Sequence, residues 1–369
     1  MDTMFPKKVM FLANATVGHT IKWVNEISRS GIDVVLVSKE DRSPEIEDTV
    51  KYVRLKHRGG LGYVRNAGQL RALVKKHKPD IINAHYASGY GLLARLASVK
   101  KYVPYLLSVW GSDVYRVPGR GRFWKWLVKG NLRYASAVGS TSHDMGHVVK
   151  RLCPTKKVLI TPFGVDIDVY KKSKEDMKED QFVVGTVKKL EFVYGMDVLI
   201  KAFSLAKSQR PHMNLELRIA GGGSQLAELK RLCNELGLKK DDVKFLGRLE
   251  QEQVPAALND LDVYVAVSRS ESFGVAVLEA SACEVPVIVS NVGGLPEVVA
   301  DGLTGYIVES ENADALSRKL IKMMDSKQDA RFCMGKAGRA FVKDNYEIGH
   351  TTSIMIQAYK ECIRIYDCN

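Results

Sequence analysis

Cysteine is sparse and long apolar runs are absent from this 369-residue sequence, and both facts narrow the class of protein. The six cysteines are scattered without a Cys-x-x-Cys pair. This pattern is typical of reduced thiols in the cytoplasm, with a redox pair of Cys362 and Cys368 as the alternative. No stretch approaches about 18 uninterrupted apolar residues, so the sequence predicts no membrane-spanning helix. The short apolar run at 9–13 lacks the length and the cleavage site of a signal peptide and fits a first β-strand better.

A recognisable zinc motif is missing as well. His143 and His147 lie four residues apart, but no third ligand stands at a suitable spacing, so we expect no bound metal. Nucleic-acid fold signatures are also absent, so we expect no nucleic-acid partner despite a net charge of +13.

The positive charge is concentrated in the first half of the chain. Residues 1–170 hold 28 Lys and Arg against 13 Asp and Glu, a net of +15, whereas the remainder has a net of −2. A partner with dense negative charge, such as anionic lipid or a phosphorylated acceptor, is therefore expected to meet the first half.

A basic and aromatic stretch runs from Arg116 to Arg133. Cationic residues alternate there with Phe123, Trp124 and Trp126. Two interpretations remain open: a helix that lies in the interface of an anionic membrane, or a core-facing helix with a solvated basic face. The charge asymmetry of the chain favours the membrane.

Alternating apolar strands and amphipathic helices fill both halves of the chain, which predicts an α/β protein with parallel sheets. The length predicts two domains. We place the boundary in the charged run 171–180, giving domains 1–170 and 171–348. A final helix at about 349–369 is expected to pack back on the first domain.

Two glutamates flank a predicted strand-to-helix turn, with seven residues between them. A buried strand at 263–267 precedes Glu271, and a helix follows from Val275. Glu271 is therefore expected at the carboxyl end of a strand, where open α/β sheets bind ligands. Gly274 allows close approach of a ligand, the first N–H groups of the helix suit a phosphate, and Glu279 lies one to two turns along.

These residues resemble the retaining glycosyltransferases of family 4. The paired-glutamate motif 271–280 is followed by 282–287, 293–297 and 301–305, and preceded by 162–166, 220–223 and 245–247, all in the family's order. The resemblance implies the GT-B architecture, in which two Rossmann-like domains face each other across a cleft. It also implies metal-independent transfer, without a cofactor, from a nucleotide-diphosphate sugar. The second domain would bind the donor and the first the acceptor.

Roles for single residues follow from the resemblance. Glu271 would hold hydroxyls of the donor sugar, and Glu279 those of the ribose. The family's phosphate-binding arginine and lysine are replaced by Lys189 and Tyr194, with Lys188 as the alternative cation. Further donor contacts are implied for the backbone at the positions matching the family's motifs: Gly18, Phe273, Gly274 and Val275.

The family's His-Gly-x-Asp turn is Trp110-Gly111-Ser112-Asp113 here. Trp110 is interpreted as stacking on a sugar face, and Asp113 as an acceptor-side contact or a structural cap of the turn. His85, at the end of the preceding strand, is either the replacement hydrogen-bond donor near the sugar or a core-capping histidine.

The leading hypothesis is a cytoplasmic glycosyltransferase, peripheral to the inner face of the cell membrane. It would add a sugar to a lipid-linked or polysaccharide acceptor in surface glycan synthesis. The alternatives are a soluble small-molecule glycosyltransferase, a sugar phosphorylase of the same fold, or a non-catalytic nucleotide-sugar-binding subunit.

Overall fold

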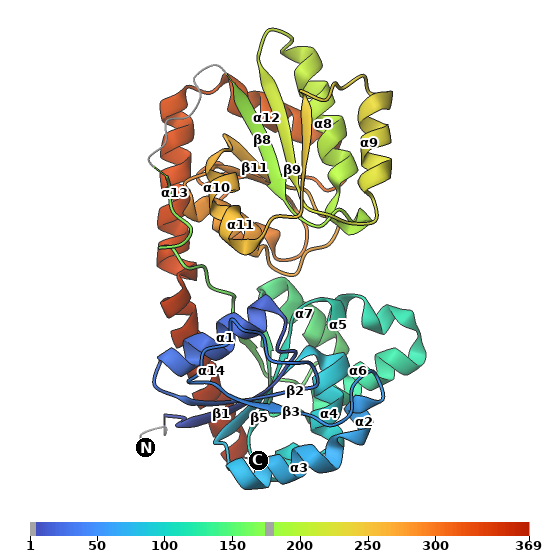
Figure 1. Ribbon diagram of the computed structural model, residues 1–369, viewed down its shortest axis with the longest axis vertical. Helices are drawn as coiled ribbons and strands as arrows, with labels where there is room; N and C mark the ends of the chain where they lie inside the picture. The colour runs from blue at the N-terminus through green and yellow to red at the C-terminus, as the bar shows by residue number, and fades with distance from the viewer. Residues whose placement is uncertain (1–4, 174–180, 369) are drawn as a thin grey trace. The chain divides into compact units, whose positions relative to one another are not determined.

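The computed structural model describes residues 5–173 and 181–368. Within these residues the chain forms two compact units (Figure 1). The first contains the described residues up to Phe163 together with those from Ile348 onward, and the second runs from Gly164 to Glu347. The division therefore precedes the charged run 171–180, of which residues 174–180 lie outside the described residues.

The first unit is built on a seven-stranded sheet in the order β3-β2-β1-β4-β5-β6-β7. Each pair of neighbouring strands is parallel. The strands are β1 (Lys8–Leu12), β2 (Asp33–Ser38), β3 (Lys51–Arg54), β4 (Ile81–His85), β5 (Tyr105–Val109), β6 (Ala137–Ser140) and β7 (Val158–Ile160).

Helices connect these strands and cover both faces of the sheet. They are α1 (Gly18–Arg29), α2 (Gly62–Arg65), α3 (Ala67–His77), α4 (Gly91–Leu96), α5 (Ser112–Tyr115), α6 (Arg122–Tyr134), α7 (His143–Leu152) and α14 (Ile348–Asp367). Short 3-10 or π-helical turns occupy η1 (Tyr86–Tyr90), η2 (Val99–Lys101) and η3 (Val117–Arg120).

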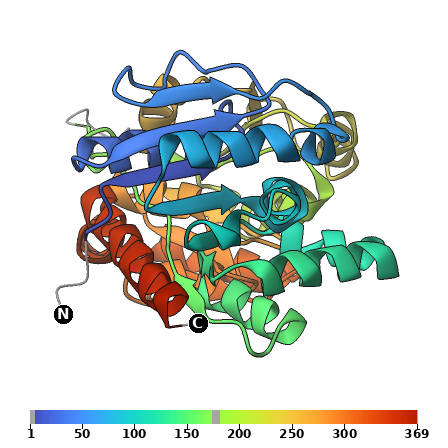
Figure 2. The same cartoon turned by 90° about the horizontal axis from the view of Figure 1, so that it is seen from below.

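The strands of the first unit are buried on both sides, which explains their continuous apolar runs. Met10, Leu12 and their counterparts on neighbouring strands pack with buried residues of α3, α4, α6 and α7. After the second unit the chain comes back to the first unit, where α14 contacts α1, β5 and β6. Figure 2 shows this helix, in red, beside the blue strands.

The second unit has a six-stranded parallel sheet in the order β10-β9-β8-β11-β12-β13. The strands are β8 (Phe182–Val187), β9 (Leu215–Ala220), β10 (Val243–Gly247), β11 (Val263–Ala266), β12 (Val287–Ser290) and β13 (Gly305–Val308). The strand predicted at 263–267 is confirmed as β11, which ends at Ala266.

The helices of the second unit also lie on two faces (Figure 1). Buried residues of α8, α9 and α12 pack together with apolar residues of the strands. Helix α11 contacts α10, α13 and β11, and α13 also contacts β13. The helices are α8 (Met196–Gln209), α9 (Leu226–Glu235), α10 (Val254–Asn259), α11 (Val275–Ala282), α12 (Ala313–Asp325) and α13 (Gln328–Tyr346), with turns η4 (Phe192–Tyr194), η5 (Gln251–Gln253) and η6 (Leu295–Val298).

Both sheets reverse their strand order at one place. The reversal falls between β1 and β4 in the first unit and between β8 and β11 in the second. Open α/β sheets bind ligands outside the carboxyl ends of the strands at such a switch point. The loops that follow these four strands are therefore the places to examine for a site.

Asp113 holds the turn that follows β5. One carboxylate oxygen accepts hydrogen bonds from the backbone N–H of Trp110 at 3.2 Å and Gly111 at 3.1 Å, and the other accepts from Ala87 N–H at 2.8 Å. The side chain is fully buried, and burial raises the pKa of Asp113 despite these hydrogen bonds. This geometry corrects the assignment of Asp113 to an acceptor-side contact, because its oxygens are committed to the turn and sealed from solvent.

We predict that Asp113→Asn lowers the free energy of unfolding by about 1–3 kcal/mol, because one acceptor is replaced by a donor facing a buried N–H. Chemical denaturation measures the loss. Asp80→Asn is the matched control: Asp80 accepts backbone N–H bonds from Lys7 and Lys8 but is exposed, so its loss should stay below about 1 kcal/mol. Equal losses would contradict the role of burial.

Candidate active site

Glu271 lies in the loop between β11 and α11, at the predicted strand-to-helix turn. Gly274 starts the helix with φ of 118°, a conformation that favours glycine. A Cβ there would stand 2.9 Å from Leu295 Cδ2, so the position has neither the conformation nor the room for a side chain. Gly274 was predicted to let a ligand approach the backbone. In the structure, the side chain of Leu295 occupies the space beside this glycine.

A second glycine turn supports the backbone of Glu271 from the other side. Gly294 N–H donates to the Glu271 carbonyl at 3.2 Å. A Cβ on Gly293, whose φ is 54°, would lie only 1.8 Å from that carbonyl oxygen. The Gly293-Gly294 pair that carries the family resemblance therefore fixes where the Glu271 side chain starts.

The Glu271 carboxylate forms an ion pair with Lys188, the residue that follows β8. Lys188 Nζ lies 2.6 Å from Glu271 Oε2, and the two side chains are only 15% and 13% exposed. Burial acts to lower the pKa of Lys188, but the charge and hydrogen bond of Glu271, together with Tyr264 and Tyr194, outweigh burial and raise that pKa. Because the two residues follow β8 and β11, this ion pair lies at the switch point of the second sheet.

The backbone around Lys188 rests on the glycine turn after β9. Cβ atoms on Gly221 and Gly223 would lie 1.9 Å from the Lys188 carbonyl oxygen and 2.3 Å from that of Leu190. Leu190 N–H also donates to Gly222 at 3.0 Å. This close approach of two loops explains why three consecutive glycines follow β9.

Arg269 ties the loop after β8 to the loop after β11. Its guanidinium pairs with both oxygens of Asp197 at 2.9 and 2.8 Å, donates to the Phe192 carbonyl at 2.7 Å and stacks 3.9 Å from the Phe192 ring centroid. A further hydrogen bond reaches Glu311. The paired fork geometry is one that arginine provides and lysine does not. Sequence reasoning missed this residue because its partners are distant in the chain.

Tyr264 lies on β11, the strand that precedes the loop of Glu271. Its side chain is fully buried on β11, and its hydroxyl donates to the Val187 carbonyl at 3.4 Å. Burial chiefly raises the pKa of Tyr264, Lys188 opposes this, and the Glu279 and Glu271 carboxylates both add to it. Sequence reasoning treated Tyr264 as a core residue because it lies within the apolar run of the strand.

Glu279 has its own partner, Tyr170. Burial, together with the nearby Glu279 carboxylate and a hydrogen bond to it, raises the pKa of the Tyr170 hydroxyl. Arg339 of α13 holds the segment that carries Tyr170 by donating to the carbonyls of Tyr170 at 3.0 Å and Ile167 at 3.1 Å. Tyr170 and Arg339 are thus site-supporting residues that no motif in the sequence indicated.

The structure distinguishes between the two lysines after β8. Lys188 reaches Glu271 and stands 5.0 Å from the Tyr194 ring centroid, whereas the adjacent Lys189 is exposed. This geometry does not support the assignment of the site's central cation to Lys189 and favours the alternative, Lys188. Tyr194, which replaces the family's lysine, contributes a ring face to Lys188 in place of a second cation.

The remaining donor-side predictions differ in their surroundings. Phe273 is buried, with its ring 5.6 Å from that of Tyr346 in an edge contact, so its side chain is not exposed to a ligand. Val275 is half-buried at the start of α11. Gly18 opens α1, where a Cβ would meet nothing within 4 Å. The space at Gly18 would admit a ligand, and its donor role stays a prediction.

In the first unit, rings from four loops gather at the carboxyl ends of the strands. His19 stacks on Phe163 with ring centroids 4.2 Å apart, and Trp110 lies 5.3 Å from Phe163 and 5.2 Å from Tyr86. Tyr86 has a φ of 67° at the start of the π-helical turn after β4, a strained conformation of the kind found at functional sites. Half-buried His19 and Tyr86 are members of this cluster that sequence reasoning missed.

Two predictions for this cluster are corrected. Trp110 is 7% exposed, and the rings of His85, His19, Tyr86 and Phe163 surround it, so no face of its indole is open to a sugar. His85 is fully buried, with Nε2 3.1 Å from Asn83 Oδ1 and Nδ1 3.4 Å from Thr20 Oγ1. Burial, with help from His19, lowers the pKa of His85 to about 3. This geometry supports the alternative of a core histidine over a contact with substrate.

Helix α6, which contains the aromatic part of the basic and aromatic stretch, has one side buried in the unit and another side with exposed aromatic residues. Leu127, Val128, Asn131 and Leu132 are buried against the unit. On its other side Phe123 is 61% and Trp126 is 62% exposed, and their ring centroids lie 6.2 Å apart. The exposed aromatic pair is accompanied by exposed cations at positions 116, 120, 122, 125 and 133.

Residues 5–173 and 181–368 offer neither a metal site nor a membrane-spanning helix. These residues contain no group of three or more His, Cys, Asp or Glu side chains arranged to hold a metal ion. Asp166 and Asp168 form an Asp-x-Asp sequence near the start of the second unit. Asp166 Oδ1 accepts hydrogen bonds from the backbone N–H groups of Asp168 and Val169. None of the described helices has the length and apolar character needed to cross a bilayer.

Comparison with known proteins matches both units to glycosyltransferase models. Residues 170–341 match the family described as glycosyl transferases group 1, and residues 8–142 match the family described as glycosyl transferase 4-like. The two matches include Lys188, Glu271 and Glu279 in the second unit and Trp110 in the first.

Individual relatives agree with these models. N-acetyl-alpha-D-glucosaminyl L-malate synthase of Bacillus anthracis is 24% identical over 308 residues, which are 81% of this chain and 79% of that protein. The GDP-mannose-dependent monoacylated alpha-(1-6)-phosphatidylinositol monomannoside mannosyltransferase of Corynebacterium glutamicum is 38% identical over 156 residues, 40% of this chain and 39% of that protein.

A solved structure shares the fold across nearly the whole chain. Anabaena HepE in complex with UDP and glucose aligns with a TM-score of 0.78 at 19% identity, covering 95% of this chain and 99% of that one. The doubly wound sheets, the glutamates at the switch point and the two family matches lead to one conclusion: the chain belongs to the family 4 glycosyltransferases and is an enzyme with the two-domain GT-B fold.

Proposed function

We propose that this glycosyltransferase moves a sugar, with retention of anomeric configuration, from a nucleotide-diphosphate sugar to a lipid-linked or polysaccharide acceptor in surface glycan synthesis. The observation that carries the donor half is the buried Lys188–Glu271 ion pair at the switch point of the second sheet. The complex of HepE with UDP and glucose and the GDP-mannose dependence of the C. glutamicum relative support a nucleotide-sugar donor.

In this proposal Lys188 and Glu271 bind different parts of the donor: Lys188 the diphosphate and Glu271 the sugar. The departing diphosphate gains negative charge as the glycosidic bond breaks, and Lys188 is the buried cation placed to stabilise it. Glu271 then accepts from hydroxyls of the donor sugar, and Glu279, held by Tyr170, accepts from the ribose hydroxyls. The positive charge of Lys188 and the N–H groups that open α11 supply the stabilisation that a metal ion would otherwise give, so we propose a metal-independent reaction.

The acceptor half of the proposal rests on the first unit. Exposed Phe123 and Trp126 lie among exposed cations on and before α6, a combination that binds anionic bilayer interfaces. The name of the C. glutamicum relative specifies a lipid acceptor. We propose that α6 brings the enzyme to the cytoplasmic face of a membrane that carries its acceptor.

A small-molecule acceptor is the second candidate. The B. anthracis relative spans 81% of this chain, and its name specifies L-malate. Under this alternative the exposed aromatic residues of α6 would have no part in binding substrate.

A thermal-shift screen with UDP-, GDP- and ADP-sugars, followed by mass spectrometry of products with lipid-linked and with small organic acceptors, tests the proposed function. Stabilisation by one class of nucleotide sugar and transfer to lipid, unaffected by a chelator, would support it. Transfer confined to soluble acceptors would support the second candidate.

We predict that Lys188→Met lowers kcat by about 10²- to 10³-fold, the usual loss on removing one electrostatic contact to a developing charge. Lys189→Met is the matched control, since it removes the same charge from the adjacent, exposed position, and should cost less than about tenfold. Because Lys188→Met leaves Glu271 without its cation, thermal unfolding of both variants accompanies the kinetics. A larger loss of kcat from Lys189→Met would return the role to Lys189.

For Tyr170→Phe we expect donor binding to weaken by about tenfold with kcat nearly unchanged, because only the hydroxyl that orients Glu279 is lost. Calorimetric titration with the donor and its nucleoside diphosphate measures this. Tyr346→Phe, which removes a hydroxyl that donates to the Glu297 carbonyl, is the control and should leave affinity unchanged. Equal effects of the two substitutions would reject the positioning of Glu279.

The double substitution Phe123→Ser/Trp126→Ser should reduce retention on vesicles containing anionic lipid by at least about tenfold, because both apolar rings lose their burial in the interface. Cosedimentation at low salt gives the bound fraction. Phe332→Ser is the control, since Phe332 is 48% exposed on α13 of the second unit. Undiminished retention of the double variant would remove α6 from membrane binding.

A further inference from the structure

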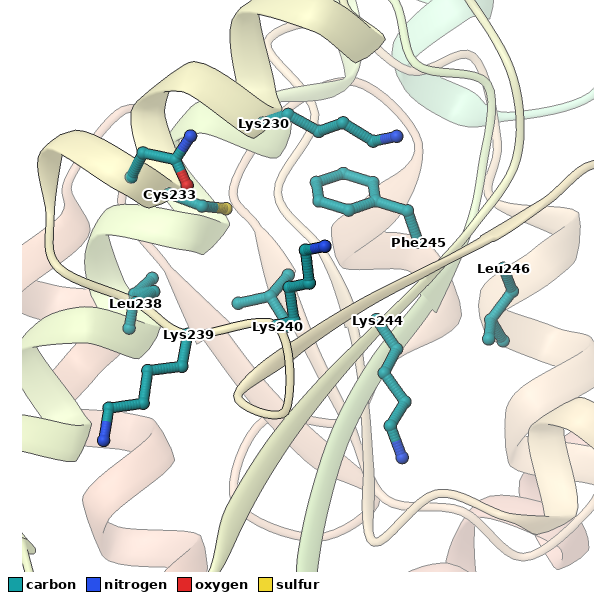
Figure 3. Close-up of a pocket in the computed structure, with 10 residues that line it drawn as sticks. Lys230, Cys233, Leu238, Lys239, Lys240, Lys244, Phe245 and Leu246 are labelled. Atoms are coloured by element: carbon teal, nitrogen blue, oxygen red, sulfur yellow. The ribbon is translucent and has the colours of Figure 1, made fainter.

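A cavity of about 530 Å³ lies at the edge of the second sheet, between α9 and β10 (Figure 3). Its volume is in the range of pockets that hold small ligands, roughly 300–1,000 Å³. The lining combines lysines with apolar and small polar side chains and contains no acidic residue: Lys230, Cys233, Asn234, Leu238, Lys239, Lys240, Val243, Lys244, Phe245 and Leu246.

Two of the four lysines are available to a ligand. In Figure 3 the side chains of Lys230 and Lys240 extend toward Phe245, whereas those of Lys239 and Lys244 extend away. Lys244 is already paired with Glu216 at 2.7 Å. Lys230 Nζ stands 5.7 Å from the Phe245 ring centroid, and neither Lys230 nor Lys240 forms an ion pair with any residue that the structure describes.

The floor of the cavity is apolar. Cys233, Leu238 and Val243 are 6%, 8% and 6% exposed, and the half-buried Phe245 lies beside them. Burial raises the pKa of the Cys233 thiol, so this group behaves as a small apolar surface. Leu246 remains 43% exposed on β10, which is the last strand on this side of the sheet.

We propose that this cavity binds a free, single-chain amphipathic anion: a phosphate or carboxylate attached to an alkyl or aryl body. The anionic group would lie between the Lys230 and Lys240 ammonium groups, and the apolar body would cover Leu238, Val243 and Phe245. Charge complementarity selects the head group, since every charged residue that lines the cavity is a lysine. The buried floor selects the body, because a fully hydrated anion would leave it uncovered.

This site is separate from the proposed donor site. None of Lys188, Glu271 and Glu279 lines the cavity. The inference therefore stands without the proposed function, and variants at Lys230 and Lys240 are expected to keep their glycosyl-transfer activity.

Calorimetric titration of the full-length protein with octyl phosphate, inorganic phosphate and octyltrimethylammonium tests the site. We expect octyl phosphate to bind at least about tenfold more tightly than the other two probes, because it alone supplies both features. The charge reversal Lys230→Glu/Lys240→Glu should weaken octyl phosphate by at least about tenfold. Lys336→Glu is the matched control, since Lys336 also stands over an exposed phenylalanine ring, 4.2 Å from Phe332, and should leave binding unchanged.

Further arms distinguish this site from other anion-binding surfaces. Phe123→Ser/Trp126→Ser on α6 should bind octyl phosphate normally, and Lys230→Glu/Lys240→Glu should still be retained on anionic vesicles. The proposal is overturned by equal binding of octyl phosphate and inorganic phosphate, or by equal affinity of wild type and the double lysine variant. Tighter binding of an acidic peptide than of octyl phosphate would assign the cavity to a protein partner instead. The less drastic Lys230→Gln/Lys240→Gln pair serves if the charge reversal unfolds the protein.

Discussion

Two opposite charges buried at one point of the second sheet constrain the loops around them. Lys188 and Glu271 are each less than one-sixth exposed, and their charged atoms lie 2.6 Å apart. Leaving either charge buried without the other would cost several kcal/mol, so the loop after β8 and the loop after β11 must keep a fixed spacing. Arg269 spans the same two loops and reinforces that spacing. The site therefore depends on backbone placement as much as on the two charged side chains.

The fixed spacing of these loops explains why glycines stand at their points of contact, where any side chain would collide with a neighbouring loop. Cβ atoms at Gly195, Gly221 and Gly293 would each lie between 1.8 and 2.1 Å from a carbonyl oxygen of a neighbouring loop. Those carbonyls belong to Val267, Lys188 and Glu271, so each glycine lets one loop rest directly on another beside the ion pair. Substituting a side chain at any of the three would push the loops apart and separate the charges. The glycine motifs of the sequence are thus part of the electrostatics of the site.

The sequence was sufficient for the sheets and for the position of both glutamates around the turn between β11 and α11, because strand periodicity and glycine turns are local signals. It was not sufficient to choose between Lys188 and Lys189. Neighbouring residues of an extended segment point to opposite sides, so a register based on Leu190 cannot say which lysine faces Glu271. The roles given to Trp110 and His85 failed for another reason. Trp110 follows β5, and the rings around its indole come from three other places, after β1, at the end of β4 and after β7. No spacing in the chain indicates that these residues meet.

The two units use the same strand order but fill their switch points with different chemistry. The second unit places a buried ion pair there, stabilised by opposite charge. The first places rings there, and the low pKa of His85, about 3, keeps that buried imidazole neutral at physiological pH. A buried, neutral His85 cannot stabilise the charge of a diphosphate, whereas the Lys188 ammonium can. The asymmetry therefore gives a physical reason, independent of family resemblance, for assigning the charged half of a nucleotide sugar to the second unit.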